Sequence, residues 1–169
     1  MKAVLLSIKP KYCELIASGK KTIEVRKTKP KIETPFKCYI YETNWKDNSY
    51  WKHHHKGKLG KVIGEFVCDS IDISVVELKP NEIEPCYWKL INGSCLTKNE
   101  LINYGKYNAL YGWHITDLKI YNKPKELSEF CKPCHDSYDP MYGSYCIYCD
   151  KRNKLTRPPQ SWCYVEVEE

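Results

Sequence analysis

The chain has 169 residues, of which 42% are apolar, and its formal net charge is +6. This length suits a single domain, 1–169, with a hydrophobic core. The sequence has no apolar run near the roughly 20 residues that a membrane-spanning helix needs, so we expect no membrane partner. The apolar residues 3–8 are interrupted by Lys9-Pro10-Lys11 without a small-residue cleavage site. They predict a first strand instead of a signal peptide, and we therefore expect a cytoplasmic protein.

The positive charge is concentrated in the first third of the chain. Residues 1–60 contain 14 lysines and arginines against 5 acidic residues, whereas residues 61–130 contain 8 against 10. Such asymmetry is typical of proteins that bind polyanions, including nucleic acids. Lysines that merely solubilise one face would produce the same pattern, so charge alone leaves both explanations open.

The N-terminal elements follow in close succession. Residues 3–8 predict a buried strand, and Pro10 suits the first turn of a short helix because its missing N–H needs no partner there. Gly19 is the expected left-handed stop of that helix. Residues 22–26 then alternate between polar and apolar side chains, which predicts a second strand.

The rest of the chain adds strands and one more helix. The predicted strands cover residues 36–41, 61–73, 110–121 and 162–168, and residues 79–95 are expected to be irregular. Thr97 and Glu100 have the spacing of a capping box, which predicts a second short helix. Because no strand–helix–strand rhythm is present, we predict an α+β fold, a small mixed β-barrel of about six strands with two short helices.

Two Cys-x2-Cys pairs, with eleven residues between them, lie between the predicted strands 110–121 and 162–168. The four cysteines are Cys131, Cys134, Cys146 and Cys149. This spacing predicts one structural zinc ion held by four thiolates, which leave no open position for catalysis. Two disulfides, reduced cysteines, an iron–sulfur cluster or a ligand from His135 remain alternatives. The segment 129–152 is thus predicted to be a zinc-binding insertion, and one functional hypothesis is that it contacts a protein partner.

The octet from Gly19 to Arg26 combines a glycine turn with four charged side chains, Lys20, Lys21, Glu24 and Arg26. Glu24 and Arg26 share one strand face about 7 Å apart, and Lys21 stands at the strand entrance. They could grip a polar ligand, with Lys21 anchoring an anion or assisting chemistry. An exposed strand with cross-strand salt bridges is the alternative.

Two other segments are candidate ligand contacts. The expected loop 44–60 interleaves aromatic residues with lysines, and its Trp45 and Trp51 could stack on unpaired bases of single-stranded RNA. Packing of these aromatics under the loop is the alternative. Arg157 precedes a stiff Pro-Pro pair that could hold it toward a cleft, although surface exposure fits equally well.

The pattern Gly19-x-Lys21-x-x-Glu24-x-Arg26, after a strand and a proline-led helix, resembles the signature of the ASCH domain family. Residues 111–118 and 157–165 resemble the family's later strand and closing segment. The resemblance implies a PUA-like β-barrel, with the motif lining a cleft between barrel and helices, and an association with RNA. Some relatives are amidohydrolases that deacetylate N4-acetylcytidine, and another is a ribonuclease.

The resemblance also implies roles for particular residues. The amidohydrolases use a lysine, a threonine three residues later and a downstream glutamate. Lys21 matches the lysine, whereas Glu24 stands at the threonine position and Ser94 lies near the glutamate position. The leading prediction is therefore binding of RNA or a nucleotide around Gly19, Lys20, Lys21, Glu24 and Arg26. A hydrolase that uses Lys21 and Glu24 for catalysis is the alternative.

Overall fold

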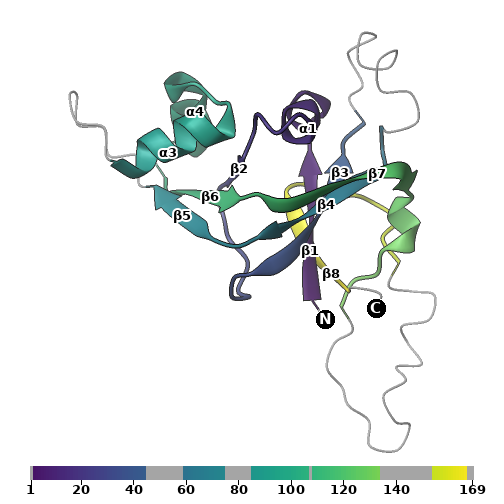
Figure 1. The fold of residues 1–169 in the computed structure, drawn as a ribbon. Helices are drawn as coiled ribbons and strands as arrows, with labels where there is room; N and C mark the ends of the chain where they lie inside the picture. Colours follow the sequence, from purple (N-terminus) through teal and green to yellow (C-terminus); the bar gives the residue numbers. More distant parts are fainter. Residues whose placement is uncertain (1, 45–58, 75–84, 107, 134–153, 167–169) are drawn as a thin grey trace, which may run out of the picture.

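The computed structural model describes residues 2–44, 59–74, 85–106, 108–133 and 154–166, with the side chains of residues 85–89 not described. The described residues form two sheets (Figure 1). The five-stranded sheet has the order β7-β4-β3-β1-β8, and β1 and β3 are its parallel pair. Its strands are β1 Lys2–Ile8, β3 Phe36–Glu42, β4 Val62–Cys68, β7 Thr116–Lys125 and β8 Trp162–Glu166. The three-stranded sheet consists of β2 Ile23–Arg26, β6 Leu110–His114 and β5 Ile71–Ser74, in that order.

The α-helices of the described residues lie on the same side of the sheets in Figure 1, with α3 next to α4 and α1 apart from them. They are α1 Pro10–Ala17, α3 Pro85–Ser94 and α4 Lys98–Gly105, and a 3-10 turn, η1, covers Leu127–Glu129. Gly19 follows α1 with a φ of +73°, as the sequence predicts. The predicted capping box is also present at α4, where Thr97 and Glu100 bond each other's backbone N–H groups. No helix in the described ranges is long and apolar enough to cross a membrane.

The predicted α+β mixed barrel is confirmed, but three element assignments are wrong. The single strand expected over residues 61–73 is two strands, β4 in the five-stranded sheet and β5 in the three-stranded sheet. The single strand expected over residues 110–121 is likewise two, β6 in the three-stranded sheet and β7 in the five-stranded sheet. A continuous alternating pattern does not reveal that a chain crosses from one sheet to another. Part of the segment expected to be irregular, 79–95, forms helix α3. Gly93 lowers the helix propensity there, and a Cβ at this position would lie 2.6 Å from Ile23.

Strand β2 is buried on both faces, and this determines where the charged octet lies. Ile23 and Val25 pack with Leu90, Leu101 and Leu110 in a core beneath α3 and α4. The opposite face carries Glu24 and Arg26, which are also buried. Glu24 pairs in register with Trp113 of β6, a member of the main core between the sheets. The polar face of β2 is therefore inside the protein, at the end of the barrel where the helices lie.

The predicted zinc insertion lies mostly outside the described residues. Cys131 is half-buried and forms an antiparallel bridge with Lys154, and the Leu155 N–H donates to the Phe130 carbonyl at 2.8 Å. The chain thus enters and leaves segment 129–152 through paired backbone. Within the described ranges, no three His, Cys, Asp or Glu residues are grouped as a metal site. Cys134, Cys146 and Cys149 fall outside those ranges, so the zinc site and the domain assignment stay predictions.

Candidate functional site

An open cleft with a volume of about 630 Å³ lies between the end of β1, helices α1 and α4, and the segment before β8. Lys21, Glu24 and Arg26 all line it. The other polar and aromatic lining residues are Ser7, Lys9, Tyr12, Thr43, Asn44, Glu100, Asn103, Tyr104 and Gln160. The cleft therefore combines two phenol rings, several neutral hydrogen-bonding groups and charges of both signs.

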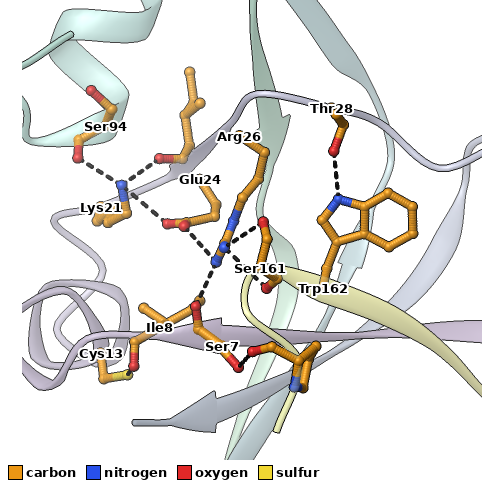
Figure 2. A network of polar contacts seen from close by, with 12 residues as sticks. Ser7, Ile8, Cys13, Lys21, Glu24, Arg26, Thr28, Ser94, Ser161 and Trp162 are labelled. Carbon is orange, nitrogen blue, oxygen red and sulfur yellow. Dashed lines mark hydrogen bonds and ion pairs between the residues drawn. The ribbon is translucent and has the colours of Figure 1, made fainter. Parts of the chain in front are cut away.

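Lys21 is almost completely buried, with an exposed fraction of 2%, and its ammonium group is fully engaged. The Nζ atom donates to the carbonyl oxygens of Ile23 and Ser94 at 2.9 and 2.8 Å, and it lies 3.3 Å from Oε2 of Glu24 (Figure 2). An ammonium group has three N–H donors, so these three oxygens account for all of them. Lys21 thus ties the C-terminal end of α3 to strand β2 and fixes one oxygen of Glu24.

Glu24 is held from its other side by Arg26. The Nη2 atom of Arg26 lies 2.9 Å from Oε1 of Glu24 and donates to the Ser7 carbonyl at 3.0 Å. Its Nη1 atom donates to the carbonyl and the hydroxyl of Ser161 at 3.1 and 3.2 Å. Glu24 therefore lies between two cations, as Figure 2 shows, and its carboxylate orientation is set before any ligand arrives.

The segment before β8 is docked onto this network. The Ser7 hydroxyl donates to the Pro159 carbonyl at 2.6 Å, and the Ser7 N–H donates to the Ser161 carbonyl at 3.0 Å. Pro158, Pro159 and Gln160 form part of the cleft wall as a result. Residues more than 130 positions apart in the sequence are thereby brought to one site.

Two tyrosines contribute the aromatic surface of the cleft. The Nζ atom of Lys21 lies 5.3 Å from the centroid of the Tyr12 ring, and that of Lys27 lies 4.9 Å from the Tyr104 ring. Burial raises the pKa of Tyr12, and the negative charges of Glu100 and Glu24 raise it further. Burial also raises the pKa of Tyr104. Both phenols therefore stay protonated and able to donate near neutral pH.

The structure does not gather every predicted contact at the cleft. Lys20 and Gly19 are exposed on the turn after α1, and Arg157 is exposed beyond the three residues that form the wall. Trp45 and Trp51 lie outside the described residues. The contacts of all five with RNA remain predictions.

Sequence reasoning did not identify Tyr12, Tyr104, Ser7 or Ser161 as residues of the site. Tyr12 lies one helical turn above Ile16 in α1, a spacing that indicates only a packed face. Tyr104 lies in the helix that the capping box predicts, but no functional motif includes it. For Ser161 the sequence did contain a signal, because this residue lies within residues 157–165, which resemble the closing segment of the family.

The family model of the ASCH domain matches residues 6–147 of the chain. The chain belongs to the ASCH domain family. Among solved structures, the ASCH protein from Zymomonas mobilis is similar, with a TM-score of 0.57 and 17% identity over 97% of this chain and 87% of that one. A tyrosine-to-phenylalanine mutant of that protein has a TM-score of 0.58 at 17% identity, covering 98% and 91% of the two chains. At this identity the likeness establishes the fold alone. No curated protein sequence matches the chain significantly.

Proposed function

We propose that this ASCH domain binds the base of an unpaired nucleotide in its cleft, within single-stranded RNA or as a free nucleotide. One observation carries the proposal. The Glu24 carboxylate is fixed by Lys21 and Arg26 in a cleft that Tyr12 and Tyr104 also line. A preoriented acceptor beside aromatic rings is the arrangement that recognises a flat, hydrogen-bonding ligand.

Glu24 retains the capacity to accept further hydrogen bonds. Each of its oxygens contacts one cation, whereas an ionised carboxylate offers about four lone-pair positions. An amino or ring N–H group of a base could therefore donate to Glu24 without displacing Lys21 or Arg26. Because Glu24 is nearly buried, such a bond would form away from bulk water, where charge-assisted hydrogen bonds are strong.

The aromatic and basic groups around Glu24 suit the rest of a nucleotide. Tyr104 is 37% exposed and presents a ring on which a base can stack. Lys27, above that ring, supplies positive charge near the rim for a phosphate group. The basic N-terminal third and the RNA association of ASCH proteins support the same class of ligand.

Hydrolysis of N4-acetylcytidine or of RNA is supported less well. A lysine that acts as a base or nucleophile needs a free lone pair, whereas Lys21 donates to three oxygens. The geometry instead favours Lys21 as a positioning residue for Glu24. Incubation of the protein with N4-acetylcytidine and with RNA tests this, since we expect no turnover at high protein concentration, and release of acetate or cleavage products would favour the hydrolase. The adaptor hypothesis rests on the zinc segment and stays a prediction.

Paired substitutions of Tyr104 test the binding proposal. We expect Tyr104→Leu to weaken binding of short single-stranded RNA about 5- to 100-fold, the usual range for loss of one stacking partner. Tyr104→Phe keeps the ring and should bind within about twofold of the native protein. Affinities would be measured by fluorescence anisotropy, with thermal melting to show that both variants are folded. Equal affinities for the leucine and phenylalanine variants would contradict the proposal.

A further inference from the structure

The loop that connects β2 to β3 begins at the rim of the cleft, where Lys27 lies over the Tyr104 ring, and contains two further lysines. Lys27, Lys29 and Lys31 alternate along it, and Glu33 is its one acidic residue. The side chains of all three lysines are exposed. Within the described part of the chain, Lys29 and Lys31 take part in no ion pair. Their charges are therefore available to an anion.

This basic loop is fixed to strand β8 by aromatic side chains. The indole Nε1 of Trp162 donates to the Thr28 hydroxyl at 3.0 Å, and the Lys31 N–H donates to the Tyr164 hydroxyl at 2.7 Å. The Trp162 and Tyr164 rings pack edge to face with centroids 5.4 Å apart, and Trp162 also packs against Trp113 of the core. The loop backbone is thus held in place at two points, which lowers the entropy that binding would cost.

A second hollow, of about 610 Å³, opens along the same loop. It is lined by Lys29, Pro30, Lys31, Ile32, Glu33 and Thr34, together with Ile71. Two lysines against one glutamate leave it with a positive balance. Among the described residues that line it there is no aromatic ring, unlike in the cleft, so it suits a charged, non-planar group such as a phosphodiester.

Residues 160–164, which lead into and begin strand β8, contact both the cleft and the basic loop. Gln160 lines the cleft, Ser161 bonds Arg26, Trp162 bonds Thr28 and Tyr164 bonds Lys31. The polar contacts around Arg26 and the Trp162–Thr28 bond appear together in Figure 2. Because a strand rises about 3.3 Å per residue, the path from Gln160 to Tyr164 is about 13 Å long. The same short segment therefore contacts the cleft at one end and the basic loop at the other.

We propose that residues 29–34, held by Trp162 and Tyr164, form a second subsite for the phosphodiester backbone next to the nucleotide in the cleft. This inference rests on the proposed function and assigns single-stranded RNA, in preference to a free nucleotide, as the ligand. Lysines that contact phosphates contribute affinity without reading the base sequence. The subsite should therefore strengthen binding of strands longer than one nucleotide, whatever their sequence.

The double variant Lys29→Ala/Lys31→Ala tests the subsite. The probes are random-sequence RNA of about six nucleotides, within the usual range of single-strand binding sites, and a mixture of nucleoside 5′-monophosphates. We expect affinity for the oligonucleotide to fall about tenfold and the salt slope to decrease by about 1.4, or 0.7 per lysine. Affinity for the monophosphates should stay within twofold.

The matched control is Lys119→Ala/Lys123→Ala, which removes two exposed charges from β7 at the opposite edge of the five-stranded sheet. It should leave the affinity for both probes within about twofold. An unchanged oligonucleotide affinity in the Lys29/Lys31 variant, or an equal loss for both probes, would overturn the subsite while leaving the cleft intact. If the native protein binds neither probe, the proposed function itself fails.

Discussion

Two glutamates, one in each sheet, show how differently a charged strand residue can be used. Glu65 of β4 accepts from the Tyr121 hydroxyl at 2.6 Å and lies 3.6 Å from Nζ of Lys37 on β3. Its side chain is 21% exposed and lines neither of the two hollows. Glu24 of β2 is 9% exposed, contacts two buried cations and lines the cleft.

The comparison separates two hypotheses that the sequence left open for Glu24. Glu65 forms a partly solvated salt bridge with Lys37 on the neighbouring strand, which is the usual arrangement for charged residues on a strand. Glu24 has the same residue type and a similar strand position, but its partners are buried and its carboxylate adjoins open space. The distinguishing features are therefore burial of the partner cations and the adjoining cleft, not the charges themselves.

The largest expected difference is in stability. Glu24→Gln leaves the buried Lys21 and Arg26 without their counter-ion, so the free energy of unfolding should fall by about 3–5 kcal/mol. Glu65→Gln should cost less than about 1 kcal/mol, because that pair is partly solvated. Urea denaturation of both variants measures this directly. Equal losses would show that the buried ion pairs of Glu24 contribute no more to stability than the partly solvated pair of Glu65.

A smaller effect is expected from the helix that forms the Tyr104 wall of the cleft. Thr97→Ala removes the N-cap of α4, which should lower the free energy of unfolding by about 1 kcal/mol. Thr97→Ser keeps the capping hydroxyl and is the matched control. Ligand affinity should fall slightly for the alanine variant only, because fraying of the first turn of α4 displaces Glu100, which lines the cleft. Wild-type stability in the alanine variant, measured by urea unfolding, would refute this account of the helix.

The smallest effect concerns pH and is specific to Glu65. Burial raises the pKa of this carboxyl, but the Tyr121 hydrogen bond and the charges of Lys37 and Lys119 outweigh it, so the net pKa is lowered. Its stabilisation is therefore present above about pH 4.3, the usual glutamate value, and is lost as the pH falls through the lower folded value. The stability difference between the native protein and Glu65→Gln should shrink over that interval in acid denaturation. A difference that stays constant with pH would contradict this assignment.

The sequence predicted much of this architecture because local signals were strong. Pro10, Gly19 and the Thr97 capping box each have one dominant structural meaning, and all three are found as expected. The breaks between β4 and β5 and between β6 and β7 were missed because alternation continues across them. The cleft was only partly predictable. The motif indicated Lys21, Glu24 and Arg26, but contacts such as Arg26 with Ser161 span 135 residues and depend on tertiary packing.

The most direct test of the proposed function is a titration of the ¹⁵N-labelled native protein with nucleoside 5′-monophosphates, followed by amide chemical shifts. We predict saturable shifts at residues 24–26 of β2 and at Asn103 and Tyr104 of α4. The amides around Glu65 should stay unchanged and serve as the internal reference. Absence of any saturable shift, or shifts centred on Glu65 and β7, would contradict the conclusion that the cleft around Glu24 binds a nucleotide.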